Sequence, residues 1–488
     1  MHSSSVSSKP CSAMLERRVC RFIRPNWRNL LAILLLICPF YLFLLWAREG
    51  GKDVNPVLKE HCITTRPSLL ERSADVQCQN GVCTRKPTAR LQKKFYAGQW
   101  DSWSVSPGHH KHYDVNCSGI IHNNQTVIRR AYELIRDEKS RDAVQLPCDD
   151  SVRNWTRNCN DYKKSRMYPM QPLTDEEAAF PIAFILTVHK ESAQVERLLR
   201  AIYQPQNVYC IHPDAKATRA FHNAIRGLAD CFDNVFVTSK IEDVQYKGYT
   251  RVQADLNCMQ DLMPYSWKYV INLCGQDFPL KTNFEIMRQL KAYKGLNDIP
   301  GVYPEQNEWY VGRTKFKHVV SNGDVVRTNR EKPLPPHGAK MFFGNAYYAA
   351  TKQYVEFVLR SEIAKDILSY LSDSLSPDEH CWVTINRYPG VPGGYLNSTW
   401  NSVVRFIRWT NSNYYPPCVG KYVRAVCVIG AGYLPQLSSQ PHLFVNKIHY
   451  DYDPITIQCL EEFLDYRTVF PDTISRYIPN FPVTNLFP

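Results

Sequence analysis

The sequence predicts an α/β fold with a parallel sheet, and three observations lead to this prediction. From residue 181 onward, nearly continuous apolar runs alternate with segments of helical spacing. Runs that are apolar throughout are typical of strands covered by helices on both faces. Segments of helical length join successive runs, and parallel strands require such long connections.

The predicted strands are the buried apolar runs PIAFILTV (181–188), NVYCIHPD (207–214), NVFVTS (234–239) and KYVINLCG (268–275). The predicted helices between them repeat apolar residues three and four positions apart. They are AQVERLLRAIY (193–203), ATRAFHNAIRGLA (217–229) and TRVQADLNCMQDLM (250–263). The pattern is that of consecutive βαβ units.

Length and charge limit the possible functions. The chain has 488 residues, 44% of them hydrophobic, and a formal net charge of +13. Such a charge suits nucleic acid, an anionic membrane surface or an anionic substrate. No GxGxxG follows the first strand and no GxxxxGK[ST] occurs, which argues against a dinucleotide oxidoreductase and a P-loop enzyme.

The N-terminal region predicts a membrane anchor. Residues 30–47 (LLAILLLICPFYLFLLWA) are apolar over about the length of a bilayer span. Arginines precede them, so the positive-inside rule leaves residues 1–29 in the cytosol and sends the C-terminus to the lumen. A cleaved signal peptide is the alternative, but Arg48 and Glu49 stand where a small-residue cleavage site would be.

The rest of the chain divides into a polar, irregular stem at 48–115 and a folded lumenal domain at 116–488. The 17 cysteines are scattered without a CxxC pair, which favours disulfides over zinc. Lumenal exposure also agrees with the N-glycosylation sequons at Asn116, Asn124, Asn154 and Asn397.

Polar residues follow the predicted strands, at the sheet edge where α/β proteins bind ligands. They are Thr187 and His189, Asp214 and Lys216, Tyr246, and Gln276 with Asp277. A nucleotide could lie along this row. The alternative is that turns are polar in any protein.

A metal site finds weak support in the sequence. Histidines 109, 110 and 112 lie in the predicted stem, where no scaffold is expected to fix them. The one Asp-x-Asp, Asp451 with Asp453, follows no convincing strand and is interpreted as a turn. Without a metal, a diphosphate would need fixed cations, for which Arg424 and Lys447 are candidates.

Two adjacent carboxylates stand in SLSPDEHCWVTI (374–385). Ser376 suits a helix N-cap, Pro377 the first helical position, and Glu379 the third, which together make a capping box. A carboxylate in that position needs no catalytic role, and Asp378 suits the first turn of a helix.

The chain resembles the β-1,6-N-acetylglucosaminyltransferases that branch mucin-type O-glycans, the core 2 and I-branching family. The resemblance runs from about residue 115 to 457. It rests on FPIAFILTVHK, RLLRAIYQPQNVYCIHPDAK, CFDNVFV, TRVQADLNCMQDL, INLCGQDFPLKTN, SPDEH, PPCVGKYVRAVCVIGAG and HLFVNKI. It implies a GT-A-like, Rossmann-type fold that binds a nucleotide sugar and works without a metal.

The resemblance also implies residue roles. The glutamate of SPDE, Glu379, becomes the catalytic base. The UDP-GlcNAc-binding residues become Thr187, Val188, His189, Asp214, Ala215, Lys216, Tyr246, Arg424 and Lys447. On the acceptor side, Trp409 matches a family tryptophan, and Arg313 and Lys315 are assigned by position, with Glu379 facing the acceptor hydroxyl. The segments 295–318 and 393–405 depart from the family pattern, which leaves the acceptor open.

The family's disulfides imply Cys117–Cys459, Cys159–Cys231, Cys210–Cys258 and Cys418–Cys427, with Cys274 as a free thiol. The pattern assigns no partner to Cys62, Cys78, Cys83, Cys148 and Cys381. Because five is odd, one thiol is expected to be free or intermolecular, and the stem cysteines are candidates for linking a homodimer.

These implications predict a Golgi-membrane enzyme that adds GlcNAc in β-1,6 linkage to Galβ1-3GalNAc of O-glycans, forming core 2. No metal cofactor and no nucleic-acid partner are expected. Alternatives are I-branching of poly-N-acetyllactosamine or mixed specificity, peptide xylosylation, and an inactive lumenal lectin or scaffold. Retention of Glu379, Arg424 and Lys447 together argues against the last.

Overall fold

A computed structural model describes residues 108–140, 146–305, 307–410 and 417–470, together with one antiparallel strand pair, β1 (Val76–Gln79) and β2 (Val82–Arg85). The predicted tail, membrane anchor and most of the stem lie outside these residues. No helix among the described residues is both long and apolar enough to cross a bilayer.

The central sheet has five strands in the order β12-β6-β3-β4-β5. The predicted parallel strands are confirmed as β3 (Ile182–Val188), β4 (Val208–Pro213), β5 (Val235–Val237) and β6 (Tyr269–Cys274). β5 is shorter than predicted, and β12 (Ala349–Thr351) adds an antiparallel edge that the sequence pattern did not indicate.

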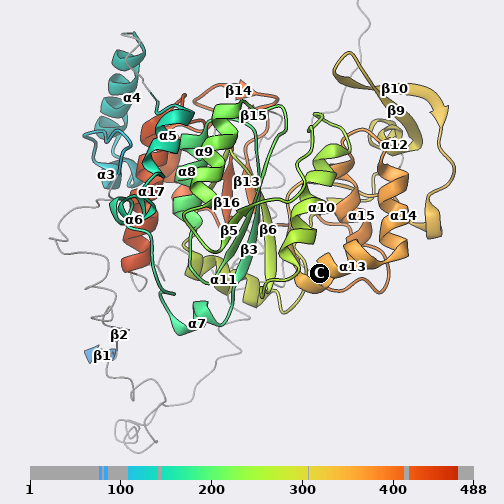
Figure 1. Cartoon of the computed structure of the whole chain (residues 1–488), viewed down its shortest axis with the longest axis horizontal. Helices are drawn as coiled ribbons and strands as arrows, with labels where there is room; N and C mark the ends of the chain where they lie inside the picture. Colours follow the sequence, from blue (N-terminus) through green and yellow to red (C-terminus); the bar gives the residue numbers. More distant parts are fainter. Residues whose placement is uncertain are drawn as a thin grey trace, which may run out of the picture. The chain divides into compact units, whose positions relative to one another are not determined.

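Helices cover both faces of this sheet (Figure 1). The predicted helices are present as α8 (Ser192–Ile202), α9 (Arg219–Ala229) and α10 (Thr250–Leu262). Phe184 and Leu186 of β3 belong to the same apolar core as α8 and α9. Ala183 and Ile185 belong to the opposite core with α10. Both faces of β3 are therefore buried, which explains its predominantly apolar sequence.

Helices after α10 build the remaining layers. They are α11 (Asn283–Ala292), α12 (Glu308–Lys315), α13 (Lys352–Arg360), α14 (Glu362–Leu371), α15 (Cys381–Asn386), α16 (Leu434–Ser438) and α17 (Pro454–Val469), with 3₁₀ turns η1 (Pro336–Gly338), η2 (Pro377–Glu379) and η3 (Ala431–Tyr433). Before the sheet come α3 (Cys117–Ile121), α4 (Gln125–Ser140), α5 (Asp149–Trp155), α6 (Cys159–Ser165) and α7 (Asp175–Ala178).

Short strands in four further sheets complete the described fold. A mixed sheet joins β13 (Arg405–Ile407), β16 (Phe444–Asn446) and β7 (Asp277–Pro279). Three antiparallel pairs are β8 (Gly301–Val302) with β11 (Phe343–Gly344), β9 (Phe316–Ser321) with β10 (Asp324–Glu331), and β14 (Tyr422–Val423) with β15 (Val426–Cys427).

Four disulfides are present: Cys117–Cys459, Cys159–Cys231, Cys210–Cys258 and Cys418–Cys427. They are the pairs that the family resemblance implies. The first joins α3 to α17 across 342 positions of sequence. Within the described chain, Cys148, Cys274 and Cys381 are free thiols. Cys62, Cys78 and Cys83 belong to the part whose side chains are not described.

The last residues assigned to the stem pack against the folded domain. His110 is buried and its Nε2 lies 2.6 Å from Glu196 Oε2 of α8. Arg166 also pairs with Glu196, at 2.8 Å, and with Glu461 of α17, at 3.0 Å. Breaking one partner of such a buried network typically costs about 3–5 kcal/mol. The histidine therefore contributes to the fold.

Glu462 of α17 predicts a pH dependence of stability. Burial raises the pKa of Glu462 to about 7, while a hydrogen bond from Gln458 lowers it. Of the nearby charges, Glu461 and Asp465 raise this pKa and Arg197 lowers it. The Nε2 atom of His112 lies 3.5 Å from the Glu462 carboxyl. Because the folded pKa exceeds the unfolded one, this carboxyl favours the folded state at low pH, and that contribution is lost as pH rises through 7.

We expect Glu462→Gln to raise the melting temperature at pH 8 and to leave it nearly unchanged at pH 4.5. Glu356→Gln, on the exposed face of α13, is the control. Thermal unfolding followed by circular dichroism at several pH values measures the difference. An equal shift at both pH values would contradict the prediction.

Candidate functional site

The ends of β3 and β4 bring the first predicted donor residues together. The parallel register pairs Thr187 with His212 and Val188 with Pro213. The Asp214 N–H donates to the Val188 carbonyl at 2.8 Å, so the residues after both strands meet at one sheet edge. His189 follows directly, and burial lowers its pKa, which favours the neutral imidazole.

Asp214 organises the loop after β4. Its Oδ1 accepts from the Lys216 N–H at 3.0 Å and lies 3.2 Å from the Lys216 ammonium. The same ammonium pairs with Asp243, and the Ala215 N–H donates to the Glu242 carbonyl at 3.0 Å. These contacts fix the segment 242–244, which leads to Tyr246.

A buried carboxyl supports the end of β3. Asp255 of α10 accepts from the Thr187 hydroxyl at 3.4 Å, from Asn272 at 3.1 Å and from the Tyr348 hydroxyl at 3.0 Å. Burial raises the pKa of Asp255 to about 6, although the last two of these contacts lower it. Sequence reasoning missed this residue because nothing in a helical pattern distinguishes a supporting carboxyl from a surface one.

Arg424 sits at the tip of the hairpin formed by β14 and β15. Val423 pairs with Val426, so Arg424 and Ala425 are the two loop residues. Both adopt positive φ, 52° and 64°, which is strained for residues other than glycine and asparagine. The conformation places the Arg424 guanidinium 3.9 Å from the centre of the Tyr246 ring.

Lys447 approaches the same hairpin from the end of β16. Its Nζ donates to the Val423 carbonyl at 3.3 Å. Burial lowers the pKa of Lys447, and the neighbouring Arg424 adds to this, while Cys274 opposes it. Arg424, Tyr246 and Lys447, which are far apart in sequence, thus form one group that we call the cationic cluster.

The segment around Glu379 differs from the predicted capping box. Pro377–Glu379 forms the 3₁₀ turn η2, and α15 begins at Cys381. Ser376 has φ 47° and its side chain makes no cap bond within the described structure, because a left-handed residue turns its hydroxyl away from the helix N–H groups. Asp378 lies in the first turn of η2, as predicted, but it is buried there and pairs with Arg251 at 2.9 Å.

Glu379 is partly exposed and pairs with Arg313 of α12, whose side chain is buried. Burial raises the pKa of Glu379, the Arg313 guanidinium opposes this, and Asp378 adds to it. A carboxylate with a raised pKa and an open side is suited to accept a proton. The structure thus brings two residues predicted for the acceptor side into direct contact.

Backbone hydrogen bonds connect this carboxylate to the cationic cluster. The Ser376 N–H donates to the Lys247 carbonyl at 2.8 Å, one residue from Tyr246. The Leu375 N–H donates to the Arg313 carbonyl at 3.0 Å. Glu379, Arg313, Tyr246, Arg424 and Lys447 therefore belong to one connected set of elements.

The remaining predicted acceptor residues lie near this set. Trp409 is 44% exposed and forms a backbone bridge with Val426, beside the hairpin that carries Arg424. Lys315 lies at the end of α12 and pairs with Glu331 at 3.2 Å. The four sequon asparagines, Asn116, Asn124, Asn154 and Asn397, are all exposed.

The metal candidates from the sequence have structural partners. His109 stacks on Trp155, and His110 pairs with Glu196. Asp453 caps α17 through the Thr456 N–H at 3.0 Å, which agrees with its interpretation as a turn residue. Among the residues described, no three His, Cys, Asp or Glu side chains are grouped as metal ligands would be.

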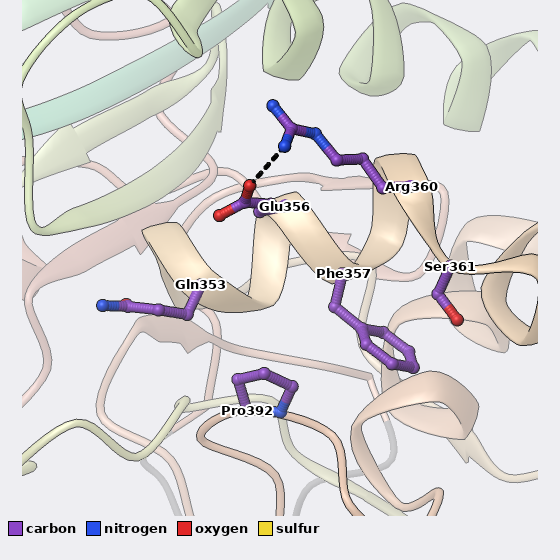
Figure 2. Close-up of a pocket in the computed structure, with 6 residues that line it drawn as sticks. All are labelled: Gln353, Glu356, Phe357, Arg360, Ser361 and Pro392. Carbon is purple, nitrogen blue, oxygen red and sulfur yellow. Dashed lines mark ion pairs between the residues drawn. The ribbon is translucent and has the colours of Figure 1, made fainter.

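Figure 2 shows an open depression of about 490 Å³ on the outer face of α13. It is lined by Gln353, Glu356, Phe357, Arg360, Ser361 and Pro392. Glu356 and Arg360 neutralise each other at 2.6 Å. The depression lacks the convergent, uncompensated polar groups that mark a ligand site, so it is not our candidate.

Comparisons with known proteins agree with this geometry. The family model "Branch: Core-2/I-Branching enzyme" matches residues 182–438, which include Glu379, Arg424 and Tyr246. A Homo sapiens N-acetyllactosaminide β-1,6-N-acetylglucosaminyl-transferase is 47% identical over 70% of this chain and 85% of its own length.

Two further relatives act on a different acceptor by name. A Homo sapiens β-1,3-galactosyl-O-glycosyl-glycoprotein β-1,6-N-acetylglucosaminyltransferase is 41% identical over 73% of this chain and 86% of its own. A Danio rerio relative with the same name and the number 4 is 41% identical over 72% of this chain and 84% of its own length. The chain therefore belongs to the core-2/I-branching enzyme family and is a β-1,6-N-acetylglucosaminyltransferase.

Proposed function

We propose that this enzyme transfers GlcNAc from UDP-GlcNAc, with inversion and without a metal, to the 6-hydroxyl of GalNAc in Galβ1-3GalNAc, which forms core 2. The observation that carries the proposal is the partly exposed Glu379 carboxylate, paired with Arg313 and connected to the cationic cluster. The proposal places the enzyme in the Golgi membrane with the domain at 116–488 in the lumen.

In the proposed step, the acceptor oxygen attacks the anomeric carbon of GlcNAc and its proton passes to Glu379. The new C–O bond forms as the bond to the diphosphate breaks, and UDP leaves with the electron pair. A positioned base of this kind contributes about 10²–10⁴-fold. UDP leaves as a stable anion, so a second carboxylic acid, as in glycosidases, is not needed.

The donor roles follow from the same arrangement. Arg424 and Lys447 stabilise the charge that develops on the diphosphate, in a preorganised and partly buried position. Thr187, Val188, His189, Asp214, Ala215 and Lys216 hold the nucleotide at the sheet edge, and Tyr246 completes the donor site beside Arg424. Arg313, Lys315 and Trp409 contact the acceptor.

The acceptor can be tested with the purified full chain in detergent. UDP-GlcNAc and UDP-xylose are each offered with Galβ1-3GalNAc, linear poly-N-acetyllactosamine and a serine peptide, and product linkage is determined by NMR. We expect a β-1,6-GlcNAc product on Galβ1-3GalNAc. Transfer of xylose to the peptide would contradict the donor assignment, and no transfer at all would favour an inactive lectin or scaffold.

I-branching is the second candidate function, and one observation favours it. The relative named for N-acetyllactosaminide is 47% identical, whereas the Homo sapiens relative named for the O-glycan acceptor is 41% identical. In the same assay, product on poly-N-acetyllactosamine alone would replace core 2 synthesis, and product on both acceptors would establish mixed specificity.

Arg313 predicts a shift in pH dependence. Its guanidinium lowers the pKa of Glu379, so Arg313→Met should raise that pKa further. We expect the acid limb of the kcat/KM profile to move to higher pH, because the base loses its proton later. Lys315→Met is the control, because it leaves the Arg313–Glu379 pair intact and should therefore leave the acid limb in place. A limb that moves to lower pH in Arg313→Met would refute this relation.

A further inference from the structure

A row of aromatic side chains adjoins the Arg313–Glu379 pair. Its members are Trp309, Tyr310, Phe343 and Trp400, and we call them the aromatic row. Ring centroids are 4.8 Å apart for Trp309 and Tyr310, 4.1 Å for Tyr310 and Phe343, and 5.6 Å for Phe343 and Trp400. Each ring therefore touches the next.

The two ends of the aromatic row face solvent. Trp309 is 64% exposed and Trp400 is 47% exposed, whereas Tyr310 and Phe343 are partly buried between them. Large apolar side chains at such exposure lose the benefit of burial, and clustered exposed aromatics commonly mark binding sites. The two tryptophans are therefore the candidates for contact with a ligand.

The backbone brings three distant segments together to form the row. β8 pairs with β11, which carries Phe343, and Gly301 of β8 exchanges two hydrogen bonds with Thr399, of 2.7 and 2.9 Å, next to Trp400. The strands approach so closely that a Cβ on Gly344 would lie 2.2 Å from the Pro300 carbonyl. Glycine at this position is therefore part of what builds the row.

Arg313 connects the aromatic row to the proposed catalytic carboxylate. Its guanidinium carbon lies 5.0 Å from the centres of both the Trp309 and Phe343 rings, while its Nη2 pairs with Glu379. A ligand on the row would thus lie one side chain away from Glu379. A sugar next to the one that accepts GlcNAc would need to lie at such a distance.

We propose that the aromatic row is a subsite for a β-linked galactose unit of the acceptor, stacked on Trp309, the exposed end of the row that contacts Arg313. Galactose has an axial 4-hydroxyl, so its C3, C4 and C5 hydrogens form one apolar face that matches an exposed indole. The proposal rests on the function proposed above, because it is the acceptor of that reaction that reaches Glu379.

Ligand contact can be tested without turnover. Saturation-transfer NMR with methyl β-galactoside and full-length protein in detergent should show the strongest transfer to the C3, C4 and C5 hydrogens. Trp309→Ala should weaken this transfer, and Trp309→Phe should restore part of it. Tyr265→Ala is the control, because it removes a 40% exposed aromatic ring just beyond the C-terminal end of α10, whereas the Arg251–Asp378 ion pair lies at the N-terminal end of that helix. This variant should have no effect on the transfer. Undiminished transfer in Trp309→Ala would overturn the subsite.

Kinetics separate the subsite from the proposed function. With UDP-GlcNAc, Trp309→Ala should lower kcat/KM for Galβ1-3GalNAc about tenfold, the effect of about 1.4 kcal/mol, and leave the value for a GalNAc monosaccharide unchanged. An unchanged preference for the disaccharide would contradict the subsite alone. A wild-type enzyme that transfers to poly-N-acetyllactosamine only, yet binds the galactoside through Trp309, would contradict core 2 synthesis and support the subsite. An Asn397→Gln background keeps a host glycan away from Trp400.

Discussion

Glu379→Gln is expected to lower kcat for GlcNAc transfer by about 10²–10⁴-fold, because the amide cannot accept the proton of the acceptor hydroxyl. Glutamine preserves the size of the side chain and can still accept a hydrogen bond from Arg313. The affinity for UDP and the melting temperature should therefore stay close to those of the wild type. Steady-state kinetics, with calorimetric titration of UDP, measure both quantities.

The matched control for this substitution is Glu356→Gln. Glu356 is another partly exposed glutamate paired with an arginine, but it lies on α13 beside the depression shown in Figure 2. Its kcat should equal that of the wild type. Near-normal turnover in Glu379→Gln, with a folded enzyme that binds donor, would reject Glu379 as the base.

Arg424→Met is expected to reduce kcat by about 10²–10³-fold, the typical effect of removing one preorganised group that stabilises transition-state charge. The guanidinium is placed on Tyr246 by a two-residue turn in which both residues have positive φ. Strained residues of this kind cluster at functional sites, where the surrounding structure holds them in place. Arg424→Lys should recover part of the loss, since it restores the charge but not the planar contact with the ring.

Lys421→Met is the control for Arg424, because Lys421 is exposed just before β14 and lies over Tyr452. The Lys421→Met variant loses the same charge at the base of the same hairpin and should keep the wild-type kcat. Equal losses in both variants would mean that general electrostatic attraction of the donor, rather than contact with the leaving group, explains the effect. Repeating both measurements at higher salt would show this directly.

The central part of the fold could be predicted from the sequence because its signals are local. Strands β3, β4 and β6 are buried on both faces, so their residues are mainly apolar, with Thr187, His212 and Asn272 as polar exceptions. Helices α8 and α9 repeat apolar residues at helical spacing. β12 could not be predicted in this way. It is an edge of three residues, Ala349–Thr351, and only its pairing with β6 makes it a strand.

The candidate site shows the same division between local and tertiary information. The role of Glu379 was suggested by family resemblance, but its local geometry was misread, because Ser376 adopts a left-handed conformation that a capping-box pattern does not reveal. The contacts of Arg313 with Glu379 and of Arg424 with Tyr246 join segments that are distant in sequence. The aromatic row was missed for the same reason, since Phe343 joins Trp400 to α12, which carries Trp309, only in the folded structure.

The most direct test of the account is the metal dependence of transfer by the full-length enzyme. The rate of β-1,6-GlcNAc transfer to its best acceptor is measured with excess EDTA and again with added Mn²⁺. Because Arg424 and Lys447 are proposed to stabilise the departing diphosphate, we predict the same kcat in both conditions. Loss of transfer in EDTA, with recovery on addition of Mn²⁺, would contradict the account.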